Sequence, residues 1–202
     1  WGRIRRTGRF ARPAMIEQLR QIAKRLLEEK KVDVVIGYGQ DAADTPAYPI
    51  FVTRPDDVDK LVWNEQCFPN LASHLKYKDV KALGRPAVIV KGCDERALVV
   101  LEQEAQLARD SIYVIGVACD GVGNPRAAKC AACKVHVPRF ADEVIGTAKE
   151  AAGDGNPYSD LEAFLQKSLP ERMAFWQAEL SRCVKCYACR SVCPMCYCNV
   201  CI

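Results

Sequence analysis

Seven of the twelve cysteines in this chain fall within its last twenty residues. The first part of this run is Cys183-Val-Lys-Cys186-Tyr-Ala-Cys189-Arg-Ser-Val-Cys193-Pro194. This C-x2-C-x2-C-x3-C-P spacing is that of bacterial-type ferredoxins, in which three thiolates bind one [4Fe–4S] cluster and the fourth binds another. A zinc ribbon instead uses two C-x2-C pairs separated by a dozen residues or more. We therefore expect at least one [4Fe–4S] cluster here, and two or more in the protein.

The run continues beyond the ferredoxin pattern with Cys196, Cys198 and Cys201. In one interpretation these thiols complete a second cluster together with Cys193 or with remote cysteines. In the other, one or two of them are buried thiols without a metal. The first is favoured, because free thiols beside a redox centre are prone to oxidation.

Four further cysteines form a second candidate metal site. Cys93 and Cys119 each follow an apolar segment that predicts a strand, and Cys130 and Cys133 make a C-x2-C pair in the loop after Cys119. The carboxyl ends of parallel strands form the ligand crevice of an open sheet. We expect two or more of these thiols to hold a metal at that rim, or to share a cluster with the C-terminal run. Cys93 also precedes a predicted helix, whose N-terminal dipole favours a thiolate.

Two other residues near these cysteines are weaker candidates. Cys67 precedes Pro69 in another loop and is expected to be a core or incidental cysteine. His136 follows Cys133 by three residues and could ligate, but an isolated histidine is usually not a ligand.

Hydrophobic periodicity predicts the fold. Helical spacing of apolar residues covers Ala14–Lys31, and a second helix is expected over Glu95–Arg109. Apolar segments at Val32–Tyr38, Pro86–Lys91 and Ser111–Val117 predict buried strands. The strand–helix–strand order predicts parallel strands joined by a right-handed crossover. The expected fold class is α/β: a compact parallel-sheet domain followed by a small, cysteine-rich, ferredoxin-like iron–sulfur module.

We expect four segments along the chain: a basic N-terminal arm over 1–13, the α/β domain over 14–150, a linker and helix over 151–182, and the iron–sulfur module over 183–202. The last helix is predicted from Ser168-Leu-Pro-Glu171, where Ser168 caps the helix and Glu171 completes a capping box. Neither end of the chain resembles a natural start or finish, so the module is expected to continue beyond Ile202.

Charge and composition indicate where in the cell the protein works and which classes of partner it could bind. The net charge of +4 is mild and is concentrated in the N-terminal arm, which is either solvated or docks to an acidic subunit. The rest of the chain is balanced, which argues against nucleic acid. We predict no membrane span and no signal peptide, because no apolar run approaches about 18 residues and no apolar segment follows the basic N-terminus. Dense reduced thiols favour the cytoplasm, or the cytoplasmic face of a membrane complex.

A glycine pattern follows the first predicted strand. Gly37-Tyr-Gly39-Gln-Asp-Ala42 matches G-x-G-x-x-A, but a dinucleotide fingerprint requires a helix there, and Pro46 and Pro49 follow instead. The pattern is weak for a nucleotide. Glycine pairs still permit a ligand to approach the backbone closely, so Gly37 and Gly39 stay candidate cofactor-binding residues.

Two segments carry a resemblance to a known family. Lys91-Gly-Cys93-Asp-Glu-Arg96-Ala-Leu98 and Ile115-Gly116-Val-Ala-Cys119-Asp-Gly121 resemble the K-x-C-[DE]-x-R-A-L and I-G-x-x-C-x-G segments of coenzyme F420 hydrogenase/dehydrogenase beta-subunit proteins. The match covers roughly residues 30 to 145. With the ferredoxin-like run, the chain resembles a 4Fe–4S dicluster subunit of anaerobic redox complexes. It departs from the family in its short length and in carrying the run after the α/β domain.

The resemblance implies electron transfer between iron–sulfur clusters and a flavin or a partner subunit. Its partners would be other redox subunits of hydrogenase, formate dehydrogenase or heterodisulfide-reductase-like complexes, with a ferredoxin or flavoprotein as a further partner. We expect an electron carrier rather than a catalytic site and assign no catalytic residue. One alternative is an FAD-containing oxidoreductase subunit that exchanges electrons with F420 or another acceptor. FAD would then lie at the rim around Gly37–Asp41, Lys91–Arg96 and Cys119–Gly121, with Gly37, Gly39, Lys91, Arg96 and Gly121 as the candidate binding residues. Another is a zinc-stabilised interaction scaffold.

Overall fold

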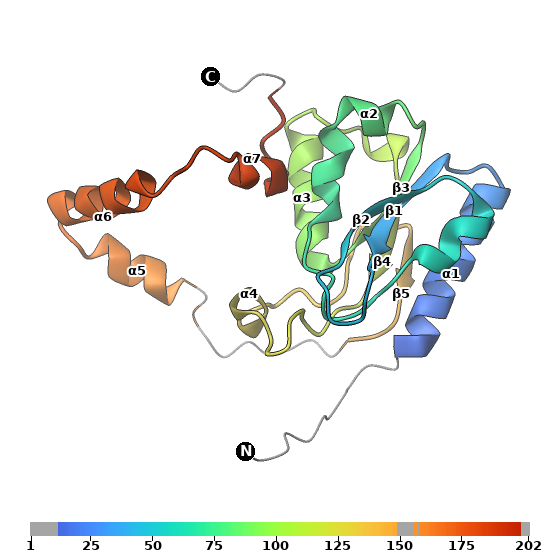
Figure 1. Cartoon of the computed structure of the whole chain (residues 1–202), viewed down its shortest axis with the longest axis horizontal. Helices are drawn as coiled ribbons and strands as arrows, with labels where there is room; N and C mark the ends of the chain where they lie inside the picture. Colours follow the sequence, from blue (N-terminus) through green and yellow to red (C-terminus); the bar gives the residue numbers. More distant parts are fainter. Residues whose placement is uncertain (1–11, 149–155, 157, 199–202) are drawn as a thin grey trace, which may run out of the picture.

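The computed structural model describes residues 12–148, 156 and 158–198 (Figure 1). Most of the predicted N-terminal arm, part of the linker and Cys201 lie outside the described residues. None of the helices in the described ranges is long and apolar enough to cross a membrane.

A mixed, mostly parallel sheet forms the centre of the α/β domain. Within the described chain its strand order is β2-β1-β3-β4-β5. The strands are β1 (Val34–Gly39), β2 (Tyr48–Val52), β3 (Pro86–Val90), β4 (Tyr113–Val117) and β5 (Glu143–Ile145). Neighbours from β1 to β5 pair in parallel, whereas β2 pairs with β1 in the antiparallel sense. The predicted α/β class is confirmed, and the antiparallel edge strand is an addition to the expected parallel sheet.

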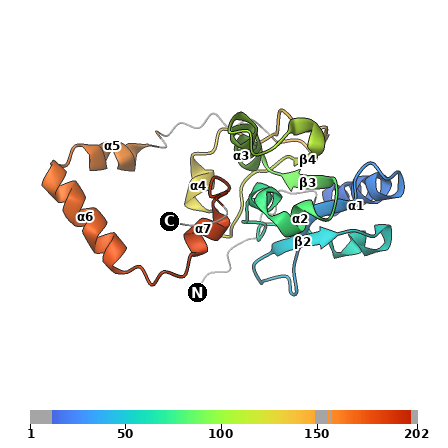
Figure 2. The same cartoon turned by 90° about the horizontal axis from the view of Figure 1, so that it is seen from above.

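Helices cover both faces of this sheet. Helix α1 (Arg12–Glu28) lies on one face and α3 (Gly92–Gln103) on the other (Figure 2). Each buries an apolar stripe that the sequence spacing predicts, including Leu19 and Leu26 in α1 and Leu98 and Leu101 in α3. Because β1, β3 and β4 are covered on both sides, they are apolar along almost their whole length.

Short helical turns complete the connections. They are η1 (Pro55–Lys60), η2 (Leu71–Lys76), α2 (Lys78–Lys81), η3 (Arg109–Ser111) and α4 (Ala128–Ala131). The loop that contains α4 joins β4 to β5, at the edge of the sheet where the parallel strands end.

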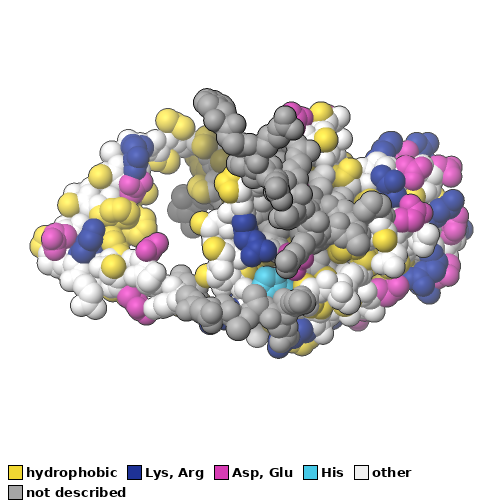
Figure 3. All heavy atoms as spheres, turned by 90° about the horizontal axis from the view of Figure 1, so that it is seen from below, with side chains coloured by type: hydrophobic (Ala, Val, Ile, Leu, Met, Phe, Trp, Pro, Cys, Tyr) yellow, Lys and Arg dark blue, Asp and Glu magenta, His cyan; other side chains and the backbone are white. Residues whose placement is uncertain are grey.

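The C-terminal part forms an arm that leaves the α/β domain and returns to it (Figure 1). It contains α5 (Ser159–Leu165), α6 (Leu169–Ser181) and α7 (Ala188–Val192). The predicted capping box of α6 is confirmed, since the Glu171 carboxylate accepts hydrogen bonds from Ser168 N at 2.8 Å and Ser168 Oγ at 2.6 Å. The rings of Phe164, Phe175 and Trp176 pack against one another, and apolar side chains gather on the surface of this arm (Figure 3).

Candidate functional site

The end of β3 places a lysine inside the protein. Lys91 is buried, its Nζ lies 2.8 Å from Asp94 Oδ2, and it donates to the Tyr38 hydroxyl at 2.5 Å. The same ammonium donates to the backbone oxygens of Cys67 and Pro69, each at 3.1 Å. A charge is stable inside a protein only when it is paired and hydrogen-bonded. Lys91 and Asp94 therefore form a buried ion pair whose donors are satisfied by its surroundings.

The protonation states of this network follow from its contacts. Burial disfavours the charge on Lys91, but Tyr38 and Asp94 outweigh burial and raise the pKa of Lys91. Burial also raises the pKa of Tyr38. Lys91 is thus an ammonium and Tyr38 a neutral phenol, which donates to the Pro69 oxygen at 2.7 Å. The Trp63 ring lies 5.8 Å from the Tyr38 ring, so the network joins β1, β3 and the loop at 61–70 beneath the rim of the sheet.

Two of the predicted rim cysteines are held by the loop after β4. Cys119 Sγ accepts a hydrogen bond from Gly121 N at 3.3 Å, and Cys130 Sγ accepts one from Val122 N at 3.4 Å. Both cysteines are half-buried, and they lie close enough to influence each other electrostatically. The backbone of this loop therefore orients two of the four candidate sulfurs.

Cys93 lies at the second residue of α3, with its Sγ 3.7 Å from Asp94 Oδ1. Although part of the residue is exposed, protein atoms crowd the sulfur, and this desolvation together with the Asp94 carboxylate raises the pKa of Cys93 to about 12. Burial likewise raises the pKa of Cys119. Desolvation and the neighbouring carboxylate therefore act against the thiolate form of Cys93 that the start of a helix was expected to favour.

His136 connects the rim cysteines through their backbone. Its imidazole is buried, with Nδ1 2.8 Å from the Cys119 oxygen and Nε2 2.9 Å from the Cys133 oxygen. A carbonyl oxygen only accepts hydrogen bonds, and a neutral imidazole has one N–H, so it donates to one of these two oxygens. In this arrangement His136 ties two cysteine-bearing segments together.

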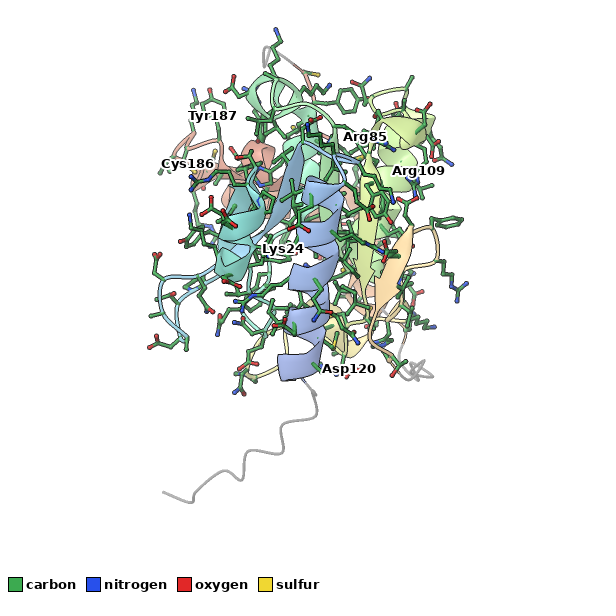
Figure 4. The ribbon with its side chains drawn as sticks, turned by 90° about the vertical axis from the view of Figure 1, so that its right-hand side faces the viewer. Lys24, Arg85, Arg109, Asp120, Cys186 and Tyr187 are labelled. Atoms are coloured by element: carbon green, nitrogen blue, oxygen red, sulfur yellow. The ribbon has the colours of Figure 1, made fainter. Side chains whose placement is uncertain are left out.

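The candidate ligands are not gathered around a single point. In the part of the chain that the structure describes, no three His, Cys, Asp or Glu side chains are placed to hold a metal ion. The rim cysteines and the end of the C-terminal run lie near opposite ends of α3. Cys93 is at the N-terminal end of this helix, whereas Tyr197 of the run donates a hydrogen bond to Glu104 at the C-terminal end. The twelve residues of α3 span about 18 Å, so the two sets of cysteines are well separated. Figure 4 likewise places Asp120, which follows Cys119, and Cys186 at opposite sides of the view.

The candidate cofactor-binding glycines lie inside the sheet. Gly37 and Gly39 are buried in β1, and an added Cβ would come within 2.3 Å of Leu61 Cδ2 at Gly37 and 2.5 Å of Ile50 Cγ2 at Gly39. Side-chain packing therefore accounts for both glycines without a ligand. The other candidates differ in access: Lys91 is buried, Arg96 is exposed on α3, and Gly121 lies half-buried in the rim loop with a φ of +116°.

Three residues of this region, Tyr38, Asp94 and Glu95, fall within the segments proposed from the sequence to surround a flavin, but no role of their own was predicted for them. Glu95 is buried, and its carboxylate accepts hydrogen bonds from Arg139 N and Phe140 N, each at 2.7 Å. These bonds fasten the segment before β5 to α3. The signal was two acidic residues directly after a buried strand, but acidic residues are common in the first turn of any helix.

The C-terminal run has a backbone suited to sulfur ligands. Lys185 and Tyr187, on either side of Cys186, have φ values of +56° and +59°. Non-glycine residues adopt this conformation at a cost of about 1 kcal/mol or more. Left-handed residues beside right-handed ones turn successive N–H groups toward one concavity, as at many iron–sulfur sites. The thiolate set and this backbone therefore fit a [4Fe–4S] cluster held by Cys183, Cys186 and Cys189.

The second half of the run is docked on the α/β domain. Lys76 Nζ donates to the Cys193 oxygen at 2.7 Å and to the Arg190 oxygen at 3.3 Å, and the Tyr77 hydroxyl donates to the Ser191 oxygen at 3.2 Å. Met195 packs against the core. Burial lowers the pKa of Lys76, while the nearby Cys196 and Cys193 thiols favour its charged form. Cys193 is consequently half-buried, whereas Cys183, Cys186, Cys189, Cys196 and Cys198 are exposed.

Curated relatives match most of this chain. It is 22% identical to the F420-dependent formate dehydrogenase 1 subunit beta of Methanococcus maripaludis over 293 residues, which is 94% of this chain and 76% of the relative. It is 23% identical to the F420-dependent formate dehydrogenase subunit beta of Methanocaldococcus jannaschii over 276 residues, or 88% of this chain and 72% of the relative. Over most of its length the chain is similar to beta subunits of F420-dependent formate dehydrogenases. No family profile matches it.

The length of these matches distinguishes the chain from the two relatives. Both matched stretches, of 293 and 276 residues, are longer than the 202 residues of this chain. The two relatives therefore carry sequence inside the matched region that this chain lacks. The shared part still includes most of the α/β domain, because 88% or more of this chain is aligned in each case.

Proposed function

We propose that this chain is an iron–sulfur electron-transfer subunit of a redox complex of the formate dehydrogenase type. The observation that carries the proposal is the C-x2-C-x2-C-x3-C-P run, with left-handed residues on both sides of Cys186. A zinc pair does not require the third cysteine at this spacing. The names of the two relatives, both formate dehydrogenase beta subunits, support the kind of complex.

Within this proposal the run has two parts. Cys183, Cys186 and Cys189 hold the first cluster, and Cys193 contributes to a second with some of Cys196, Cys198 and Cys201. When bound, such clusters supply reversible one-electron transfer, and the protein sets their potentials through hydrogen bonds, burial and nearby charge. Arg182, Lys185 and Arg190 flank the run and favour the more negative, reduced state. The docked half of the run lies next to the α/β domain, which supports passage of electrons toward that domain or a partner subunit.

The rim cysteines are proposed as a separate centre. Cys119 and Cys130 accept backbone hydrogen bonds, and His136 ties the segments of Cys119 and Cys133 together. Cys93 lies close enough to Cys119 for their charges to interact. A metal at this rim would recruit two or more of these four thiols and would lower their pKa by its own charge.

A flavin at the rim is the alternative function. Exposed Arg96 and the left-handed Gly121 could accept a cofactor there, but Gly37 and Gly39 are covered by side chains and contribute no surface to it. The electron-carrier proposal therefore rests on more of the observed features than the flavin alternative.

The first test is to measure iron, zinc, acid-labile sulfide and flavin per chain on protein purified without oxygen. About four iron and four sulfide would mean one cluster, and about eight or more would support two or more centres. Bound flavin would move the oxidoreductase alternative ahead. Zinc without sulfide would overturn the iron–sulfur proposal and favour the scaffold.

Cysteine variants separate the two sets of ligands. Cys186→Ser is expected to remove the first cluster of the run and leave any rim metal in place. The Cys93→Ser, Cys119→Ser double variant is expected to lose rim metal alone, and unchanged metal content in that variant would refute the rim centre. Cys67→Ala is the matched control, because Cys67 lies in the core and belongs to neither set.

A further inference from the structure

Lys76 belongs to the α/β domain but bonds to the C-terminal run. It is the last residue of η2, and more than a hundred residues of chain separate it from its two acceptors. Its ammonium donates to the Cys193 oxygen at 2.7 Å and to the Arg190 oxygen at 3.3 Å. These carbonyls lie at the C-terminal end of α7, and the Cys193 oxygen also accepts a hydrogen bond from Cys196 N at 3.2 Å.

The surroundings of Lys76 make this contact specific. Lys76 and Cys193 are both half-buried, and the adjacent Tyr77 donates a hydrogen bond to Ser191 in the same turn. The Cys193 and Cys196 thiols lie within electrostatic range of the ammonium. One side chain thus fixes the backbone of the fourth cysteine of the ferredoxin pattern and places a positive charge beside the next cysteine.

We propose that Lys76 is a positioning residue that holds Cys193 against the α/β domain and, by its charge, raises the reduction potential of the centre to which Cys193 and Cys196 contribute. This inference rests on the proposed function, since it requires the run to hold iron–sulfur clusters. Reduction adds one negative charge to a cluster, and a fixed cation nearby stabilises that charge. A hydrogen bond to a charged donor also orders the segment more strongly than one to a neutral donor.

The test compares three substitutions. Lys76→Met keeps the length of the side chain but removes the charge and its donors, while Lys76→Arg keeps both. Lys78→Met is the matched control, because Lys78 is an exposed lysine two residues away on α2. Two properties are measured: the reduction potentials, by an EPR-monitored redox titration, and hydrogen exchange of the α7 amides in the metal-free protein. The Ser191 and Cys193 amides report on docking, since they bond to the Tyr187 and Cys189 oxygens.

The expected result is a lower potential for one centre in Lys76→Met and an unchanged potential in Lys76→Arg and Lys78→Met. Exchange of the α7 amides should quicken on the order of tenfold in Lys76→Met alone, as the loss of a charge-assisted hydrogen bond predicts. Potentials in Lys76→Met equal to those of Lys78→Met would overturn the tuning role, and equal exchange rates would overturn the positioning role. Absence of iron and sulfide from the parent protein would instead refute the proposed function, while the exchange measurement would still decide whether Lys76 docks the run.

Discussion

The two sets of cysteines are organised in different ways. At the rim, Cys119 and Cys130 are half-buried and accept backbone hydrogen bonds, and buried His136 fixes the segments around them. In the run, Cys183, Cys186 and Cys189 are exposed at the end of an arm. The rim thus takes its geometry from the α/β fold, whereas the run has a suitable backbone whose thiols come together only around a ligand.

In the described part of the chain neither set places three ligands around one point, but only the rim is held by contacts of the α/β fold. Thiolates that surround nothing repel one another, so a cluster site closes when the metal binds, and binding then contributes directly to folding. A rim built into a sheet edge does not depend on metal in this way. The comparison predicts a module whose order depends on iron beside a domain whose order does not.

Removing iron is expected to have the largest effect and to affect one region only. Treating the reduced, iron-loaded protein with a chelator should abolish hydrogen-exchange protection across residues 183–187, because the ligand that closes this exposed part of the run is gone, whereas the α7 amides, docked through Lys76, should keep part of theirs. The α/β domain should unfold in denaturant with a free energy changed by no more than about 0.5 kcal/mol, as expected for a distant change. Equal loss of protection in both regions would show that the domain also depends on the clusters.

Lys91→Met tests the opposite region and is expected to destabilise the α/β domain by about 3–5 kcal/mol. The substitution leaves the Asp94 carboxylate buried without its cation, and an unpaired buried charge is strongly unfavourable. Urea unfolding measures the effect, and the Lys91→Met, Asp94→Leu double variant is the control, because removing both charges should recover much of the loss. Destabilisation of the double variant as large as that of Lys91→Met would contradict the ion-pair explanation.

Much of the α/β domain was predictable because its strongest elements are long and uniformly apolar. Strands β1, β3 and β4 and helices α1 and α3 lie where periodicity places them, to within a few residues at most ends. Strand β5 was missed, since it is only three residues long and its pattern is too short to show a period. Helix α5 was missed as well: its apolar residues remain exposed, so no buried stripe marks it.

The candidate site was predictable in its cysteines and not in their surroundings. Spacing identifies the run, and the ends of the strands identify Cys93 and Cys119. The burial of Lys91 was not predictable, because lysine is almost always exposed and Tyr38, one of the two partners that make burial tolerable, lies 53 residues away in the sequence. The contact of Lys76 with the C-terminal run was not predictable either, since its hydrogen bonds join residues more than a hundred positions apart in the sequence.

Ser168→Ala tests whether the C-terminal arm is stabilised independently of the α/β domain, and its expected effect on stability is smaller. It removes the hydroxyl that donates to Glu171 at the start of α6 and should lower the stability of this helix by about 1 kcal/mol. Exchange of the amides in the first turns of α6 would quicken, while unfolding of the α/β domain would not change, because the arm contributes little to its core. Slower folding or a lower midpoint of the domain would show that the arm is packed on it.

The pH dependence of the same capping box is the smallest effect expected. Hydrogen bonds from the Ser168 side chain and backbone hold the pKa of Glu171 below its ordinary value of 4.5. A carboxylate with a lowered pKa stabilises the folded helix above its unfolded pKa, and that contribution disappears as the pH falls through the folded pKa. Carbon chemical shifts of residues 169–175 in the metal-free protein should therefore be constant from about pH 7 to about pH 5 and lose helical character below about pH 4.5. Glu171→Gln should weaken the box at all pH values and remove this dependence, whereas an equal pH dependence in that variant would assign the transition to another carboxylate.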